Sequence, residues 1–243
     1  MGHFALIGHP VAQSGSPRLF AAAYGGRHSY ELLDGAEFAP LWQTFLDRLD
    51  GINITAPYKL DAFRSVDHPS ERSRLTGAVN LAVKTASGIA GYNTDVDGVI
   101  RSLREADRAL SRALVIGCGG AGRAAAAGAL ELGCGVRLWN RTADKASSLA
   151  CALGVETAPS LPEAVAWADV VIYTLPGSVP IPSGLLSLEG KVVLEAEYRS
   201  PQLSHAPCLR YLSGRRWLLY QAVAGYSLFT GEIPQVEEME KVL

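Results

Sequence analysis

The stretch Ala113–Gly122, which reads ALVIGCGGAG, decides the fold of the second half of this chain. Its first four residues form an apolar run that is typical of a buried strand. An alanine-rich segment that favours helix follows at about 123–132. Gly117, Gly119 and Gly122 lie between the two, and they allow a tight turn in which a pyrophosphate meets the helix N-terminus. The stretch therefore predicts a dinucleotide-binding turn, with a structural turn that binds no ligand as the alternative.

Strands and helices alternate on both sides of this turn. The apolar pattern predicts strands at 136–139, 155–157, 169–173 and 191–194, and helices at 144–153 and 161–168. Such alternation is typical of a doubly wound parallel sheet. A last helical stretch is expected from 217 to 229 and on toward 240.

The first half of the chain has a similar mixture of elements. It predicts strands at 4–8, 30–33 and 51–54, a hairpin made by 78–83 and 88–90, and helices at 16–23, 38–49 and 96–106. Ser16 precedes Pro17, so Ser16 is expected to be the N-cap and Pro17 the first helical residue. The chain is therefore expected to be an α/β protein with two domains.

Bulk composition excludes several classes of function. The chain has 243 residues, of which 48% are hydrophobic and 19% charged, and its net charge of −2 gives no electrostatic case for binding nucleic acid. No apolar run approaches the roughly 20 residues of a membrane span, and the N-terminus lacks the basic region of a signal peptide. The four cysteines lack CxxC spacing, which favours free thiols over disulfides. We therefore expect a cytoplasmic protein without a metal site.

The residues after 136–139 bear on the choice of dinucleotide. An NAD site carries Asp or Glu about 20 residues beyond the glycines, to bind the ribose hydroxyls. This chain has Asn140, Arg141 and Thr142 there, and Lys145 follows. Arginine can clamp a phosphate through two hydrogen bonds, so the pattern favours NADP over NAD. The alternatives are that Arg141 is an exposed arginine without a ligand and that Lys145 only belongs to the polar face of its helix.

Two short segments offer groups that can move a proton. Residues 53–59 read NITAPYK and end in Lys59, and residues 93–95 read NTD and end in Asp95. Both ionisable residues are expected in turns, where an amine and a carboxylate can assist a hydride transfer from a nearby cofactor. Taken alone, Lys59 is more often a surface lysine and Asp95 an N-cap. Ser14 and Ser16 add two hydroxyls around one glycine, and alone they would be a turn residue and a cap.

Taken together, these segments resemble the shikimate dehydrogenase family. The matching segments follow the family's order over nearly the whole length, namely 12–17 (AQSGSP), 53–59, 77–80 (GAVN), 93–95, the glycine turn, 140–142 and 221–222 (QA). The resemblance implies an N-terminal substrate-binding domain (1–96, completed by the helices of 217–243) and a Rossmann domain that binds NADP (97–216). It also implies an active site in the cleft between the two domains.

The resemblance further implies a role for each matching residue. Lys59 would be the catalytic group at the reacting oxygen, paired with Asp95. The substrate would be bound by Ser14 and Ser16 at its carboxylate, by Asp95 and others at its hydroxyls, and by a nearby tyrosine, which gives the set Ser14, Ser16, Thr55, Asn80, Asp95, Tyr198 and Gln221. The cofactor would be bound by Gly117, Gly119, Gly120, Ala121, Gly122, Asn140, Arg141, Thr142, Lys145 and, near the nicotinamide, Gly214.

The implied reaction is the reversible reduction of 3-dehydroshikimate to shikimate by NADPH, on the way to chorismate and the aromatic amino acids, by a monomer or homodimer. One alternative is a related enzyme that also accepts quinate and uses NAD. Another is a non-catalytic NADP-binding sensor with the same fold, although such a sensor need not keep both Lys59 and Asp95. Methylene-tetrahydrofolate dehydrogenases have a comparable architecture, but they would not need the serine pair.

The chain departs from the family pattern at a few positions. The sequence after the fourth strand of the nucleotide domain is usually Asn-Ala-Thr and is Tyr173-Thr174-Leu175 here. Glu195 stands where Asp is usual, and Leu81 replaces a frequent Thr. The first departure puts side-chain contacts to the cofactor in doubt at that position.

Overall fold

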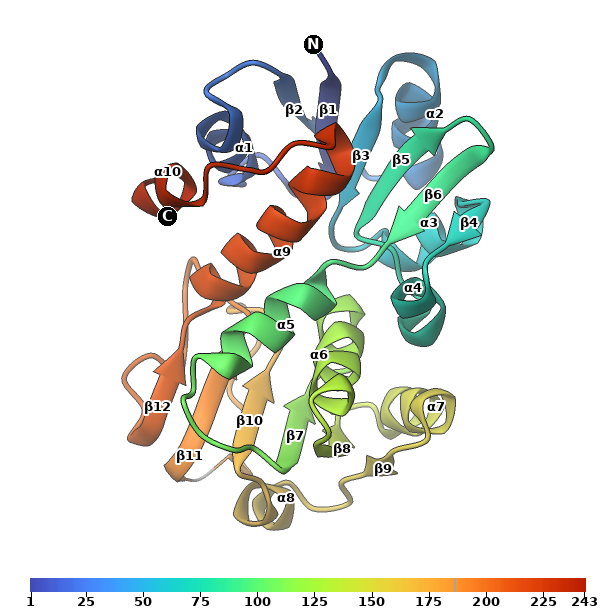
Figure 1. Cartoon of the computed structure of the whole chain (residues 1–243). Helices are drawn as coiled ribbons and strands as arrows, with labels where there is room; N and C mark the ends of the chain where they lie inside the picture. Colours follow the sequence, from blue (N-terminus) through green and yellow to red (C-terminus); the bar gives the residue numbers. More distant parts are fainter. Residues whose placement is uncertain (186) are drawn as a thin grey trace. The chain divides into compact units, whose positions relative to one another are not determined.

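A computed structural model describes residues 1–185 and 187–243 of the chain (Figure 1). Contacts between residues divide it into two compact units. The first comprises Met1–Thr94 and Gln221–Leu243, and the second comprises Asp95–Tyr220. Both are α/β, as the sequence predicts.

A six-stranded mixed sheet forms the centre of the first unit, in the order β2-β1-β3-β5-β6-β4. Its strands are β1 (His3–Gly8), β2 (Ser29–Asp34), β3 (Gly51–Ile54), β4 (His68–Pro69), β5 (Leu81–Thr85) and β6 (Gly88–Tyr92). Strands β2, β1 and β3 run parallel, so their carboxyl ends meet at one edge of the sheet. The expected hairpin is confirmed, because β5 and β6 pair antiparallel, although β5 begins at Leu81 rather than at 78.

Six helices among the described residues contribute to this unit: α1 (Ser16–Tyr24), α2 (Phe38–Arg48), α3 (Lys59–Ser65), α4 (Glu71–Thr76), the later part of α9 (Gly214–Thr230) and α10 (Val236–Lys241). Three expectations were wrong here. Gly15, not Ser16, is the N-cap of α1, and Lys59 is the first residue of a helix instead of a turn residue. The helix expected to continue from 217 toward 240 is broken into α9 and α10, with Pro234 in the break.

Aromatic side chains attach α9 to the first unit. The ring centroids of Phe20 in α1 and Tyr226 in α9 are 4.8 Å apart, and those of Phe4 in β1 and Phe229 in α9 are also 4.8 Å apart. Such aromatic pairs contribute beyond the area that they bury. Gly51 makes room for the helix, because a Cβ there would lie 2.8 Å from the Phe229 ring. No helix among the described residues is long and apolar enough to cross a membrane.

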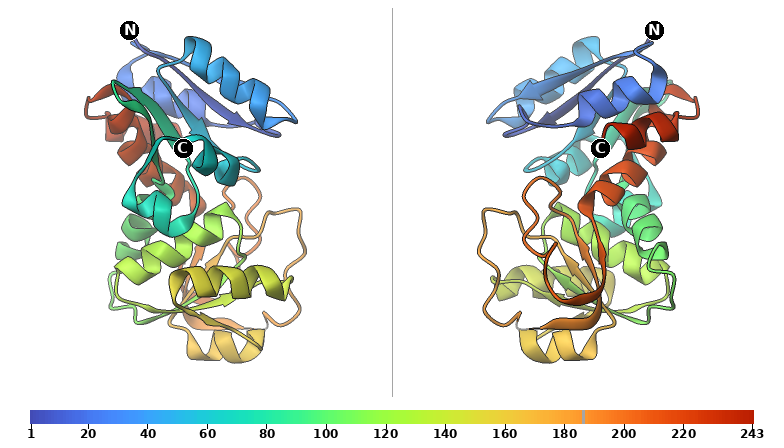
Figure 2. Two further views of the ribbon diagram at one scale, coloured as in Figure 1. Left: turned by 90° about the vertical axis from the view of Figure 1, so that its right-hand side faces the viewer. Right: turned by 90° about the vertical axis from the view of Figure 1, so that its left-hand side faces the viewer.

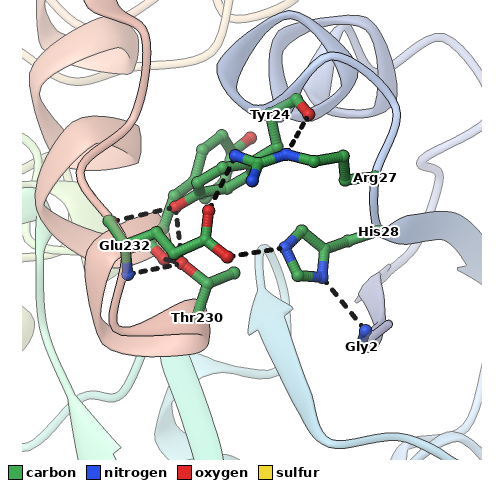
Figure 3. A network of polar contacts seen from close by, with 7 residues as sticks. Gly2, Tyr24, Arg27, His28, Thr230 and Glu232 are labelled. Carbon is green, nitrogen blue, oxygen red and sulfur yellow. Dashed lines mark hydrogen bonds and ion pairs between the residues drawn. The ribbon is translucent and has the colours of Figure 1, made fainter.

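A polar network joins the end of α9 and the residues after it to α1 and the segment that follows α1 (Figure 3). Glu232 accepts a hydrogen bond from Arg27 (2.7 Å) and lies 3.5 Å from Nε2 of His28. Thr230 donates to the hydroxyl of Tyr24 (2.9 Å), so the last residue of α9 and Glu232 just after it are joined to α1 and to the segment that follows α1. The C-terminal segment is therefore an integral part of the first unit.

The second unit has a sheet of six strands that all run parallel, in the order β12-β11-β10-β7-β8-β9. Its elements are β7 (Arg112–Ile116), β8 (Gly135–Trp139), β9 (Glu156–Thr157), β10 (Val170–Tyr173), β11 (Leu188–Glu195), β12 (Cys208–Leu212), α5 (Asp95–Arg104), α6 (Gly120–Glu131), α7 (Ala143–Leu153) and α8 (Leu161–Trp167). The predicted doubly wound parallel sheet is confirmed. The edge strand β12 was not expected from the sequence.

Alternation along the strands explains the layers of the second unit. Ala113 and Val115 of β7 pack in one apolar cluster with α5, α6 and α7, whereas Leu114 and Ile116 pack in another with α8. Successive side chains of a strand point to opposite faces, so a continuous apolar run fills both layers. Figure 2 shows α5 to α7 in green to yellow and α8 in gold around these strands.

Candidate active site

Ser14 lies in the loop between β1 and α1, and Ser16 is the first residue of α1; we call residues 9–16 the serine loop. Ser14 donates a hydrogen bond to the hydroxyl of Ser16 (3.0 Å), and the backbone N–H of Ser16 donates back to Ser14 (3.2 Å). Both side chains are partly buried. The structure therefore brings the two hydroxyls together at the start of α1, where rotation about each C–O bond can turn the hydroxyl hydrogen toward an anion.

Thr55 lies beside the beginning of this loop. Its backbone N–H donates to Ile7 in β1 (3.0 Å). A Cβ on Gly8 would lie 2.4 Å from the Thr55 methyl group and 2.7 Å from Val11, so only glycine fits between them. The absence of a side chain at Gly8 thus lets the serine loop and Thr55 approach each other.

Asn80, Thr94 and Gln221 form a side-chain cluster in the first unit. Asn80 donates to Thr94 (3.1 Å) and to Gln221 (3.3 Å), and its own oxygen accepts from the backbone N–H of Thr94 (2.8 Å). Asn80 and Thr94 are 3% and 2% exposed, so these amides and hydroxyls are kept from water. Gln221 comes from α9, which is how the C-terminal helix contributes to this cluster.

Tyr30 links the serine pair to this cluster, and sequence reasoning missed it. Its hydroxyl donates to Oδ1 of Asn53 (2.7 Å) and accepts a hydrogen bond from Ser16, while the Asn53 amide donates to the carbonyl of Asn80 (3.3 Å). Desolvation raises the pKa of Tyr30 well above its usual value, and Tyr226 adds to the rise, so the hydroxyl stays protonated. No local signal marks Tyr30, because a tyrosine in a strand is ordinary.

Lys59 and Asp95 each begin a helix, so the expectation of a turn is wrong for Asp95 as well as for Lys59. Lys59 is the first residue of α3 and partly buried, and its carbonyl accepts from Val79 (2.9 Å). Tyr58 precedes it and donates to the carbonyl of Gly35 (2.6 Å), which fixes the start of the helix. Asp95 is 8% exposed and follows Thr94 directly, so the carboxylate is next in sequence to the cluster described above.

The glycine turn of the second unit has the geometry that its spacing predicts. Gly117 has φ of +102°, which favours glycine, and a Cβ on Gly122 would lie 1.9 Å from the Gly117 carbonyl oxygen. Helix α6 begins at Gly120, earlier than the expected 123, so Gly120 and Ala121 form its first turn. Backbone N–H groups at such a helix start are free to bind a phosphate. The cradle therefore fits a dinucleotide.

Asn140 joins this turn to the end of β8. Its oxygen accepts from the backbone N–H of Cys118 (3.3 Å), and its amide donates to the carbonyl of Thr142 (3.0 Å). The side chains of Arg141, Thr142 and Lys145 are exposed. Two exposed cations and a hydroxyl thus lie in the segment that follows β8.

The loop after β11 carries Tyr198, and Glu195 organises it. Glu195 is fully buried and accepts from the backbone N–H groups of Gln202 (2.7 Å) and Leu203 (3.1 Å) and from the hydroxyl of Tyr211 (2.8 Å). Burial and this bond raise the pKa of Tyr211 above its usual value. The glutamate that departs from the family pattern therefore closes the loop of residues 196–203 as a carboxylate with three donors.

Two further positions complete the second unit. Gly214 begins α9, and a Cβ there would lie 2.5 Å from the carbonyl oxygen of Ala196, so the helix start and the loop after β11 approach as closely as glycine allows. Thr174, within the departure at 173–175, donates its hydroxyl to the carbonyl of Ile116 (2.9 Å). That side chain therefore supports the glycine turn from behind.

Models of known families match both parts of the chain. The shikimate dehydrogenase substrate-binding domain matches residues 6–82, and the NAD-binding domain of D-isomer specific 2-hydroxyacid dehydrogenases matches residues 85–179. A shikimate dehydrogenase (NADP⁺) of Haloarcula marismortui is 35% identical over 98% of this chain and 97% of its own length.

Solved structures give the same picture. A shikimate 5-dehydrogenase of Thermus thermophilus in complex with NADP(H) and shikimate superposes with a TM-score of 0.87 at 31% identity, over 100% of this chain and 98% of its own. A quinate dehydrogenase of Corynebacterium glutamicum in complex with NAD has a TM-score of 0.83 at 27% identity, over 99% and 97% of the two chains.

Proposed function

Because this chain belongs to the shikimate dehydrogenase family, we propose that it catalyses the NADP-dependent, reversible reduction of 3-dehydroshikimate to shikimate. The observation that carries the proposal is the chain of bonded polar groups from Ser14 through Tyr30 and Asn80 to Gln221. Partly buried hydroxyls and amides in such number suit a small molecule that carries a carboxylate and several ring hydroxyls. An analogue that lacked one hydroxyl would leave a buried partner unpaired.

In this proposal seven residues hold the substrate. Ser14 and Ser16 bind its carboxylate. The hydroxyls are bound by Thr55, Asn80, Asp95 and Gln221, and Tyr198 also contacts the substrate. The pairing of Ser14 with Ser16 and of Asn80 with Gln221 in the free protein keeps these groups oriented, which reduces the entropy lost when the substrate binds.

Lys59 is the proposed catalytic residue. When NADPH is bound, it supplies a hydride to the ring ketone. A cationic Lys59 stabilises the charge that develops on the ketone oxygen and gives that oxygen a proton. Asp95 orients Lys59 and holds the neighbouring hydroxyl.

The cofactor is held by the second unit. The backbone of Gly117, Gly119, Gly120, Ala121 and Gly122 receives the pyrophosphate, and Asn140, Arg141, Thr142 and Lys145 receive the adenosine ribose and its 2′-phosphate. Gly214 offers a backbone contact to the nicotinamide. The exposed cations and the glycine cradle support this assignment.

The remaining expectations follow from the same proposal. Residues 1–96 with 217–243 form the substrate-binding catalytic domain, and residues 97–216 form the NADP-binding domain. The enzyme works in the cytoplasm as a monomer or homodimer. The four cysteines, which are free thiols, are compatible with a reducing compartment.

A second candidate is an enzyme that oxidises quinate with NAD. The similarity to the quinate dehydrogenase of Corynebacterium glutamicum favours it. The exposed cations of 140–145 argue for NADP instead, because they suit the extra phosphate.

One set of assays tests the proposal. The purified chain is incubated with 3-dehydroshikimate and either NADPH or NADH, and with shikimate or quinate in the reverse direction. We expect the highest kcat/KM for shikimate with NADP. Turnover of quinate with NAD and not of shikimate would establish the second candidate, and binding of NADPH without turnover of either substrate would establish a sensor.

A further inference from the structure

The serine loop is held at its beginning by Asp34, the last residue of β2. The Asp34 carboxylate accepts from the backbone N–H of Val11 (2.8 Å) and lies 2.6 Å from Nδ1 of His9. The backbone N–H of Ala12 also donates to it. One carboxylate thus restrains successive residues of the loop, and these bonds lower the pKa of Asp34, the Val11 bond most strongly.

The restraint on Val11 extends to the serines. The carbonyl of Val11 accepts from the backbone N–H of Ser14 (2.9 Å), which forms the turn that presents Ser14 to Ser16. Val11 is 1% exposed and packs beside Gly8 and Thr55. A shift of Val11 would therefore displace the serine pair relative to Thr55.

The other end of the loop is held from the same strand. Tyr30 of β2 shares a hydrogen bond with Ser16, and its ring packs on Phe20 of α1 with centroids 4.7 Å apart. Tyr30 and Asp34 are four residues apart in a strand, so they lie on the same face. Glu31 lies on the opposite face, where it pairs with Arg48 (2.7 Å).

We propose that Asp34 and Tyr30 are positioning residues that hold the two ends of the serine loop, and that they thereby set the affinity for the carboxylate of the substrate. This inference rests on the proposed function, because it takes the serine pair as the carboxylate site. Neither residue touches the reacting atoms, so both act on substrate binding rather than on proton or hydride transfer.

The test compares Asp34→Ala, Asp34→Asn, Tyr30→Phe and a control, Glu31→Ala, in the full-length chain. We expect Asp34→Ala to raise KM for shikimate about tenfold, the effect of losing one hydrogen bond to a charged group, with kcat and KM for NADP nearly unchanged. Asp34→Asn keeps an acceptor for Val11 and should recover most of the affinity. Tyr30→Phe should raise KM about fivefold, as expected for a neutral hydrogen bond. Glu31→Ala loses an ion pair on the other face of β2 and should leave KM for shikimate unchanged.

Amide hydrogen exchange on the same variants separates this inference from the proposed function. Asp34→Ala should speed exchange in residues 9–16 and not in residues 53–59, whatever the substrate is. Unchanged exchange in 9–16, or faster exchange with unchanged KM, would overturn the inference. An equal loss in kcat and in both KM values would overturn it as well, since that marks a general structural defect. Absence of shikimate turnover by the unaltered enzyme would overturn the proposed function, while the exchange data would still show whether Asp34 holds the loop.

Discussion

The two units present their functional groups in opposite ways. In the first unit, the groups expected to bind a ligand are side chains. Several of them are already hydrogen-bonded to one another, as in the set formed by Asn80, Thr94 and Gln221. In the second, the groups expected to bind a ligand are backbone N–H groups around Gly117 and Gly122, followed by the exposed side chains of 141–145.

The difference follows from what each ligand requires. A hydroxylated ring is distinguished from its analogues by donors and acceptors at fixed positions, so the side chains must be oriented in advance. A pyrophosphate needs only closely approaching N–H groups and positive charge. Substitutions in the first unit should therefore be coupled to one another, whereas those in the second should act separately.

The largest effect should follow the loss of the proposed catalytic amine. Lys59→Ala should lower kcat by at least about 10²-fold, the range of a positioned acid or base, while substrate affinity changes much less. Steady-state kinetics with shikimate measure both, and Lys241→Ala, which removes an exposed lysine paired with Glu238, serves as the control. If Lys59→Ala has a normal kcat and only a raised KM, Lys59 does not transfer the proton.

The glycine cradle allows a sharp contrast between two substitutions. Gly122→Ala places a methyl group against the Gly117 carbonyl, so it should lower Tm and raise KM for NADPH by roughly 10²-fold through misplacement of the turn. At Gly119 no described residue other than its neighbours in the chain lies within 4 Å of an added Cβ, so Gly119→Ala should keep Tm. Gly119→Ala should nevertheless raise KM for NADPH, because its methyl group meets the cofactor. Normal NADPH kinetics in Gly119→Ala would show that no pyrophosphate approaches this position.

Coupling within the first unit can be measured directly. Asn80→Ala removes the hydrogen bonds from Asn80 to Thr94 and to Gln221 and leaves buried groups unpaired. The kcat/KM for shikimate should therefore fall about 30-fold. Because Asn80 bonds to Gln221, the double variant with Gln221→Ala should lose less than the product of the two single losses. If the loss of kcat/KM in the double variant equals the product of the two single losses, Asn80 and Gln221 are not coupled. The expected difference between the two units would then be wrong.

The sequence predicted the elements whose signal is local. The run 113–122 and the alternation after it fixed the parallel sheet, because a buried strand and a glycine turn leave a pattern within ten residues. Strand β12 was not predicted, because its sequence, CLRYL, lacks a continuous apolar run. Its leucine Leu209 and its arginine are exposed at the edge of the sheet. Lys59 was expected in a turn, yet it is the first residue of α3, two residues after Pro57.

The serine cap shows a different limit. Ser16 was expected to cap α1 because it precedes Pro17, yet its hydroxyl is engaged by Ser14 and Tyr30 instead. Long-range partners of this kind have no local signature, and the same holds for Glu195, whose donors come from residues 202, 203 and 211. Sequence therefore indicated which residues are chemically special better than it indicated what holds them.

Removal of the serine hydroxyls should have a moderate effect on binding alone. The double variant Ser14→Ala, Ser16→Ala should raise KM for shikimate about 20-fold, because both hydroxyls are only partly buried and water offsets part of the loss, which leaves about 4.5-fold for each. The interaction is equal in the ground and transition states, so kcat should fall much less. Isothermal titration of the variant with shikimate checks the same loss. Normal affinity in the double variant would leave the serines as residues of the helix start only.

The smallest effect should fall on cofactor choice, where the contacts are exposed and separate. Arg141 lies in the exposed segment after β8 and can bind the 2′-phosphate with a charge-assisted hydrogen bond. We expect the unaltered enzyme to prefer NADPH over NADH by at least about tenfold in kcat/KM, since 1.4 kcal/mol corresponds to tenfold. Arg141→Ala should remove most of this preference while leaving the kinetics with NADH unchanged, and Lys145→Ala should remove a smaller part, because a lysine offers no bidentate contact. Among the described residues, no contact joins these two side chains to each other or to the glycine turn. The loss of NADPH preference in the double variant should therefore equal the product of the two single losses. Equal efficiency with the two cofactors in the unaltered enzyme, or a preference for NADH, would show that this segment does not bind the 2′-phosphate. Either result would favour the quinate-type enzyme.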